Sequence, residues 1–285
     1  MVGNISDYIL EEKIGGGAFS IVYKATRASD SFKEKKVYAI KVLNKKIVKT
    51  EGSKAIKQFE READIAIHLN HENVVKVYEW GYFNDNLSIV MEYVEGKNLN
   101  EFMLEPDKYP FEKLIEIGYK IGKGLVYIHQ NGIIHKDLKP ENILISNDEK
   151  IVKVTDFGIA KVPKKWWQRD IFEKAGTERK YSRISYASPE QKKGRATMKS
   201  DIYSLGVVID ELLVAKLSVP DKNEEDYFQR ITNVALKYKR EIPILSENLP
   251  IPDLCKEILR KSTANNTNIR FDTSEEFVYQ ISKFI

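Results

Sequence analysis

The sequence predicts an α+β fold, because segments typical of strands and segments typical of helices occupy different parts of the chain. Short runs rich in β-branched and aromatic residues dominate the stretch up to residue 94, with one amphipathic helical segment among them. Longer stretches with apolar residues at helical spacing dominate the remainder. A polar stretch at 135–142 lies among apolar runs. Loops held by buried strands commonly carry chemistry, so we expect a functional site there.

The first predicted element is a pair of strands joined by a glycine-rich turn. Residues 8–23 contain I-G-G-G-A-F-S-I-V, which gives the pattern G-x-G-x-x-S-x-V from Gly15 to Val22. Glycine lets backbone N–H groups approach a phosphate without interference from a Cβ atom. Phe19, at the tip, is expected to shield such a site from water. Alone the pattern is weak evidence, since an ordinary glycine hairpin would look the same.

A strand with one interrupting lysine is predicted next, at 37–43. In V-Y-A-I-K-V-L, Lys41 stands within an otherwise apolar and β-branched segment. A lysine on a core strand needs an anionic partner. The alternative is an edge strand from which Lys41 points outward.

An amphipathic helix is predicted at 53–69, since Ile56, Phe59 and Ala63 recur at helical spacing. Its central F-E-R-E-A offers two glutamates, Glu60 and Glu62. Either one alone would also fit a solvated helix face.

Two more strands, at 73–82 and 87–94, are predicted to complete a five-stranded sheet, with a turn at 84–86 between them. A long helix at 111–130 follows and ends before Asn131 and Gly132, a typical stop signal. A strongly apolar helix is predicted from Ser200 to about Val214.

The polar stretch at 135–142 reads H-K-D-L-K-P-E-N, and D-F-G follows at Asp156. Apolar runs on both sides place Asp137, Lys139, Asn142 and Asp156 on turns between buried strands. An aspartate can accept a hydroxyl proton, a lysine can neutralise a phosphate, and amide and carboxylate oxygens suit Mg²⁺. Phosphoryl transfer from a nucleotide needs these groups, because there the protein mainly positions reactants and neutralises charge.

Taken together, these motifs resemble the eukaryotic-type (Hanks-type) serine/threonine protein kinases, and S-P-E-Q at 188–191 is common among bacterial members. The resemblance implies a bilobal kinase domain over 8–285, with residues 1–7 as an N-terminal extension. Its N-lobe, about 8–94, would hold a small antiparallel sheet and one helix. A hinge at about 92–96 would lead into a larger, mainly helical C-lobe at about 97–285.

The same resemblance implies an enzyme that transfers the γ-phosphate of ATP to serine or threonine hydroxyls of protein substrates, including its own activation segment. Asp137, Lys139 and Asn142 would be catalytic, and Asn142 and Asp156 would hold Mg²⁺, with Mn²⁺ as an alternative. Lys41 would bind phosphates and pair with Glu62, with Glu60 as the less favoured partner. The implied nucleotide-binding residues are Ile14, Gly15, Gly16, Gly17, Ala18, Phe19, Ser20, Ile21, Val22, Ala39, Lys41, Glu62, Met91, Glu92, Val94 and Leu144.

Within that set, Ala39 and Val22 would sandwich adenine, and the backbone of Glu92 and Val94 would hydrogen-bond it. Met91 would stand at the back of the adenine pocket, or be core filler. Elsewhere, Asp201 would brace the catalytic loop, and Arg270 would pair with Glu190.

Three positions depart from the family pattern. Lys136 stands where arginine is usual, and Ser20 replaces the third glycine. In the activation segment, at 159–187, Arg183 occupies the place of the usual threonine, so Ser182 or Thr177 would have to take its role.

The activation segment has two further features. The adjacent Trp166 and Trp167 are expected to anchor it on the C-lobe or, alternatively, to dock a partner. Its hydroxyls at Thr177, Ser182 and Ser185 lie among many cations, which predicts autophosphorylation there.

The amino-acid composition limits the classes of protein to which the chain can belong. With 285 residues, 42% of them hydrophobic, the chain can bury a sizeable core. A net charge of +4 and only short lysine runs favour solvated surfaces over nucleic-acid binding. The single cysteine, Cys255, is interpreted as a core residue. No apolar run approaches the roughly 18 residues of a membrane helix, and no signal peptide is evident, so a cytoplasmic protein without a membrane span is expected.

Two other classes of function stay open. A kinase-like small-molecule phosphotransferase shares H-x-D-x-x-x-x-N but typically lacks the S-P-E segment and its Arg270 partner. A nucleotide-binding scaffold without transfer activity is the other, and the intact Lys41, Asp137, Asn142 and Asp156 argue against it.

Overall fold

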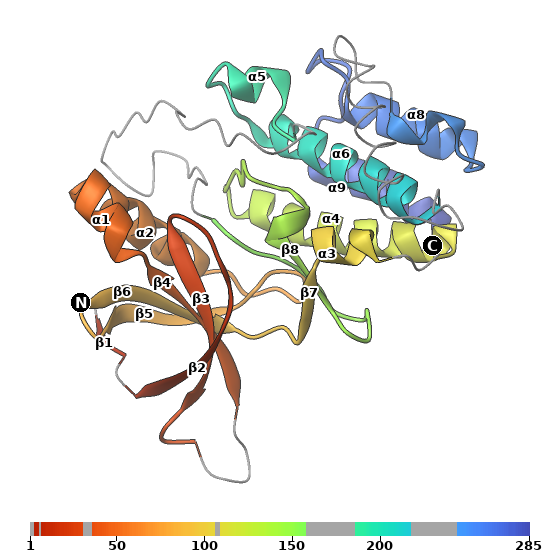
Figure 1. Cartoon of the computed structure of the whole chain (residues 1–285). Helices are drawn as coiled ribbons and strands as arrows, with labels where there is room; N and C mark the ends of the chain where they lie inside the picture. Colours follow the sequence, from red (N-terminus) through yellow and green to blue (C-terminus); the bar gives the residue numbers. More distant parts are fainter. Residues whose placement is uncertain (1–2, 6, 31–35, 106–108, 158–185, 218–243) are drawn as a thin grey trace. The chain divides into compact units, whose positions relative to one another are not determined.

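The structure, a computed structural model, describes residues 3–5, 7–30, 36–105, 109–157, 186–217 and 244–285. The chain divides into two compact units. The first contains residues 1–95 and 155–159, and the second contains residues 96–154 and 160–285. The first is built on a sheet and the second is mainly helical, which confirms the predicted α+β, bilobal fold (Figure 1).

The first unit holds a six-stranded sheet with the order β1-β5-β6-β4-β3-β2. Five of these strands pair with one another in antiparallel fashion, as predicted. Their bounds are β2 (Tyr8–Gly16), β3 (Ser20–Arg27), β4 (Val37–Leu43), β5 (Val77–Phe83) and β6 (Asn86–Glu92). These segments form strands because β-branched and aromatic side chains pack well on a pleated surface.

The sixth strand was not predicted. β1 (Gly3–Asn4) runs parallel to β5, with Gly3 opposite Gly81, and Ile5 then packs in a core cluster with Tyr8 and Tyr38. Residues 3–5 thus pack onto the sheet, although they precede the predicted kinase domain of 8–285. A two-residue strand is too short to show any periodicity in the sequence.

Two helices accompany this sheet, where one was predicted. α1 (Lys45–Glu51) begins at Asn44, whose side chain accepts a hydrogen bond from the N–H of Lys46. α2 (Ser53–Ala66) ends three residues earlier than expected and buries Phe59, Glu62 and Ala63. Gly52, with φ of +58°, separates the two helices.

The second unit combines a small sheet with six helices among the described residues. The sheet has the order β7-β8-β9, formed by β7 (Gly96–Asn98), β8 (Ile143–Ser146) and β9 (Val152–Val154). The helices are α3 (Leu99–Leu104), α4 (Phe111–Gln130), α5 (Pro189–Lys192), α6 (Met198–Leu217), α8 (Asp253–Ser262) and α9 (Ser274–Ile281). Short 3₁₀ turns are η1 (Pro140–Asn142), η2 (Leu245–Asn248) and η3 (Ser282–Phe284).

Helix α6 is the centre of this unit. Nearly all its residues are buried, and it packs against α4, α8 and α9 (Figure 1). At Gly206 a Cβ atom would lie 2.1 Å from the Ser262 hydroxyl, so α6 and α8 can approach this closely only with glycine there. Cys255 on α8 is fully buried, and burial raises the pKa of its thiol to about 12. No described helix is long and apolar enough to cross a membrane.

Candidate active site

The H-K-D-L-K-P-E-N stretch forms a tight loop of the second unit that leads through η1 into β8. Within it, the Asp137 carboxylate accepts hydrogen bonds from two side chains. Lys139 Nζ lies 2.6 Å from Asp137 Oδ2, and Asn142 Nδ2 lies 3.0 Å from the same oxygen and 2.8 Å from the Asp137 carbonyl. The three residues predicted to be catalytic are thus adjacent, and the carboxylate has a fixed direction.

Asp201, on α6, holds the loop at 135–142 in place through hydrogen bonds. Its carboxylate accepts hydrogen bonds from the backbone N–H groups of His135 and Lys136, both at 2.8 Å. Lys136 has φ of +67°, a conformation that costs energy for a residue with a side chain. The two hydrogen bonds to a fully buried aspartate hold the loop in this conformation. The predicted bracing contact of Asp201 is present.

Sequence reasoning missed a third partner of this aspartate. His129, at the end of α4, places Nε2 3.0 Å from Asp201 Oδ2 and Nδ1 3.0 Å from the Ser274 hydroxyl. The only signal in the sequence was a polar residue within an apolar helix, which most often marks an ordinary core position.

In the first unit, Lys41 joins two carboxylates. Its Nζ donates a hydrogen bond to Glu62 Oε1 and lies 3.3 Å from Asp156 Oδ1. Lys41 is only 8% exposed, and β4 lies between β3 and β6, so the edge-strand alternative is wrong. The partner on α2 is Glu62, as expected, rather than Glu60.

For both Lys41 and Glu62, burial and the charge of the other residue shift the pKa in opposite directions. For Lys41, burial lowers the pKa, but the nearby Asp156 and Glu62 carboxylates outweigh it and the pKa is raised. For Glu62, burial raises the pKa to about 7, although Lys41 opposes this rise. Its second oxygen, Oε2, is buried and has no hydrogen-bond partner in the described part of the chain.

The glycine-rich turn links β2 and β3. Gly16 has φ of +129°, and a Cβ atom there would lie 2.6 Å from the Ser20 carbonyl oxygen, so the turn requires glycine at this position. A Cβ atom on Gly17 would meet nothing within 4 Å, and the N–H of Gly17 donates to the Ser20 carbonyl at 2.8 Å. The Phe19 ring lies against Phe59 of α2, with 6.4 Å between ring centroids. Its proposed role in excluding water stays a prediction.

The remaining predicted nucleotide-binding residues are distributed over both units. Ile14, Gly15, Ala18, Ile21, Val22, Ala39, Met91, Glu92 and Val94 belong to the first unit, and Leu144 on β8 belongs to the second. The N–H of Glu92 donates to the Lys76 carbonyl, so this N–H is not the predicted adenine contact.

Two oxygen donors remain candidates for a metal. Asn142 directs its amide nitrogen at Asp137, so its Oδ1 would be the atom that could face a metal. Asp156 supplies a carboxylate. No group of three or more His, Cys, Asp or Glu that could hold a metal ion occurs among the residues described. Mg²⁺ commonly uses one or two protein oxygens together with phosphate oxygens, so this donor chemistry fits it.

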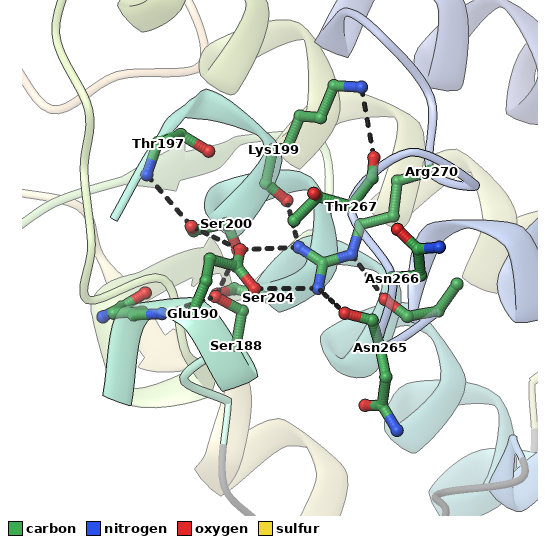
Figure 2. Close-up of polar contacts among 12 residues, drawn as sticks. Ser188, Glu190, Thr197, Lys199, Ser200, Ser204, Asn265, Asn266, Thr267 and Arg270 are labelled. Carbon is green, nitrogen blue, oxygen red and sulfur yellow. Dashed lines mark hydrogen bonds and ion pairs between the residues drawn. The ribbon is translucent and has the colours of Figure 1, made fainter. Parts of the chain in front are cut away.

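The S-P-E motif is joined to the segment that carries Arg270 through an ion pair, which the family resemblance implied (Figure 2). Arg270 NH1 and NH2 lie 2.7 and 3.0 Å from the two carboxylate oxygens of Glu190. Burial opposes ionisation, but hydrogen bonds from Arg270, Ser200 and Ser188 hold the Glu190 pKa at about 2. Trp166, Trp167, Thr177, Ser182, Arg183 and Ser185 lie outside the described residues.

Comparisons with known proteins show the family to which the chain belongs. A family model described as "Protein kinase domain" matches residues 8–278. The chain is 35% identical over 288 residues to the "Probable serine/threonine-protein kinase CPE1738" of Clostridium perfringens, covering 99% of this chain and 39% of that protein. It is 35% identical over 272 residues to "Serine/threonine-protein kinase PrkC" of Bacillus subtilis, covering 94% and 39%.

A solved structure supports the fold. The PknI kinase domain of Mycobacterium tuberculosis has a TM-score of 0.68 at 22% identity, and the match covers 98% of this chain and 97% of that one. The chain spans well under half the length of the two curated relatives named above.

Proposed function

Because this chain belongs to the protein kinase family, we propose that it transfers the γ-phosphate of ATP to serine and threonine hydroxyls of proteins. The observation that carries the proposal is the Asp137 carboxylate, whose Oδ2 accepts hydrogen bonds from both Lys139 and Asn142. A carboxylate so oriented can accept the proton of an attacking hydroxyl. General-base catalysis of this kind contributes roughly 10²- to 10⁴-fold in rate.

The other residues of the chain would position the phosphates. Lys139 lies beside the proton acceptor, where its positive charge can neutralise charge that develops on the transferred group. Lys41, fixed by Glu62, would bind the phosphates nearer the nucleoside. Asn142 Oδ1 and Asp156 would hold Mg²⁺. When bound, the ion would supply charge neutralisation at the phosphate oxygens.

Two features support serine and threonine over tyrosine as acceptors. Lys139 belongs to a D-x-K-P-E-N sequence that resembles serine/threonine kinases, whereas tyrosine kinases generally carry arginine and alanine in that region. The relatives at 35% identity are named as serine/threonine kinases. Autophosphorylation at Thr177, Ser182 or Ser185 is part of the proposal, because a phosphate would relieve repulsion among Lys174, Arg179, Lys180 and Arg183.

One experiment separates this proposal from the two other classes of function. The protein is incubated with labelled ATP, Mg²⁺ and a generic basic protein, and the labelled amino acids are identified. Label on serine or threonine supports the proposal. Transfer of label to an added small-molecule alcohol without protein labelling would indicate a small-molecule phosphotransferase, and ATP binding without any transfer would indicate a scaffold.

A further inference from the structure

Gln191, the last residue of S-P-E-Q, makes a contact that neither the motif nor the proposed function assigns. It lies on α5, and its side-chain Nε2 donates a hydrogen bond of 2.6 Å to the backbone carbonyl of Lys136. Lys136 directly precedes the candidate catalytic Asp137. The contact therefore joins α5, which follows the activation segment, to the loop that carries the candidate proton acceptor.

The peptide group between Lys136 and Asp137 is held at both of its polar atoms. Its carbonyl oxygen accepts from Gln191, and its N–H, which belongs to Asp137, lies 3.2 Å from His135 Nδ1. Asp201 holds the preceding N–H, that of Lys136. Because Lys136 has φ of +67°, this peptide would relax to another orientation if its hydrogen bonds were removed. Rotation of the peptide would turn the Asp137 side chain as well.

The position of Gln191 is itself fixed by contacts of the neighbouring residues. The Ser188 hydroxyl caps α5 by accepting a hydrogen bond from the Gln191 N–H at 3.3 Å. The neighbouring Glu190 is locked to Arg270 and also accepts a hydrogen bond from the Ser200 hydroxyl at 2.7 Å (Figure 2). An amide carried on such an anchored turn can impose an orientation on the loop that it contacts.

The side-chain oxygen of Gln191 indicates that the hydrogen bond to the Lys136 carbonyl does not serve stability alone. Gln191 Oε1 is buried and has no hydrogen-bond partner within the described residues. Exchanging the two amide atoms would bring Oε1 against the Lys136 carbonyl, two acceptors facing each other, so the orientation is determined. A buried acceptor without a partner destabilises a fold, and a long apolar side chain at this position would avoid that cost.

We propose that Gln191 is a positioning residue, which fixes the Lys136–Asp137 peptide and so directs the Asp137 carboxylate at the attacking hydroxyl. This inference rests on the proposed kinase function. It assigns Gln191 no contact with ATP or with the reacting atoms. Loss of its donor should therefore lower kcat without weakening nucleotide binding.

The test compares three variants of the whole chain with the wild type. Gln191→Met keeps the length of the side chain but has no donor, and Gln191→Glu keeps the shape and loses the donor only while ionised. Lys193→Ala, at an exposed position just after α5, is the matched control. The measurements are kcat, KM for ATP, the thermal unfolding midpoint, and kcat as a function of pH.

Gln191→Met is expected to lower kcat about tenfold or more, with KM for ATP changed by less than about twofold and an unfolding midpoint equal to or above that of wild type. In Gln191→Glu, kcat relative to wild type should rise as the pH falls, because the protonated carboxyl can donate to the Lys136 carbonyl. Lys193→Ala should match wild type in all four measurements.

Two results would overturn the inference while leaving the proposed function intact. One is an active wild type with an equally active Gln191→Met. The other is a loss of activity that parallels a loss of folded protein and shows no pH-dependent recovery in Gln191→Glu. An inactive wild type would instead contradict the proposed function, and the inference with it.

Discussion

At the scale of single residues, the first prediction concerns Lys41 in the first unit. In Lys41→Met, Glu62 loses its cation, but burial already raises the Glu62 pKa to about 7, so the carboxyl can take up a proton instead of staying charged. We therefore expect a small change in the unfolding midpoint. Activity should fall roughly 10²-fold or more, because a phosphate-binding cation is lost.

Thermal unfolding with and without ATP, beside an activity assay, checks this prediction. The increase in unfolding midpoint on adding ATP should be smaller in Lys41→Met than in wild type. Unchanged activity would show that Lys41 does not bind the phosphates.

The sequence predicted some single residues and not others for a physical reason. Glu62 could be paired with Lys41 because it lies nine residues before His71, where the family resemblance implies the helix glutamate. His129 and Gln191 could not be assigned, because the family resemblance implied no partner for either, and their partners, Asp201 and the Lys136 carbonyl, lie more than 50 residues away in sequence. Nothing in their local sequence differs from that of an ordinary polar residue.

Among the secondary-structure elements, β1 and α1 show where sequence periodicity fails. Two residues cannot show alternation, and α1 has seven residues, none of them buried. Longer elements, such as α4 and β4, lie where the sequence predicted them, because several apolar positions repeat within each.

The docking of β1 can be tested at Ile5. Ile5 is 3% exposed within the core of the first unit, whereas Ile9 on β2 is 54% exposed. Ile5→Ala is expected to destabilise the protein by about 2 to 4 kcal/mol, because it leaves a cavity in a packed core. Ile9→Ala is the control and should have little effect. Equal unfolding midpoints for the two variants in denaturant or heat would show that the N-terminal strand does not contribute to the core.

The link between α5 and Arg270 carries a prediction about pH. The Glu190 pKa is about 2, below its ordinary value of 4.5. A lowered folded-state pKa means that the ionised form stabilises the fold. This stabilisation is fully present above about pH 4.5 and is lost as the pH falls toward 2.

Glu190→Gln removes this titration and leaves the buried Arg270 without its anionic partner. We expect a lower unfolding midpoint at neutral pH, with a cost of about 3 kcal/mol. Between pH 4.5 and 2, the midpoint of the variant should fall less steeply than that of wild type. Parallel curves from a series of thermal unfolding experiments would contradict the assigned role of this pair.

For the whole molecule, the proposal includes a modification of the activation segment. Phosphate at Thr177, Ser182 or Ser185 would pair with nearby cations and with Lys136 beside Asp137. Lysine binds phosphate as a point charge, without the bidentate geometry of arginine, so we expect appreciable basal activity and modest activation. Mass spectrometry and activity assays of protein prepared with and without a phosphatase check both expectations. A fully inert dephosphorylated enzyme would contradict the second.

The central claim is that Asp137 is the proton acceptor of a serine/threonine protein kinase. The most direct measurement is the transfer of labelled phosphate to serine and threonine of a basic protein by wild type and Asp137→Asn, with ATP binding measured by titration calorimetry. The variant should bind ATP like wild type and retain no more than roughly one hundredth of its transfer rate. Transfer by Asp137→Asn at a rate near that of wild type would contradict the claim.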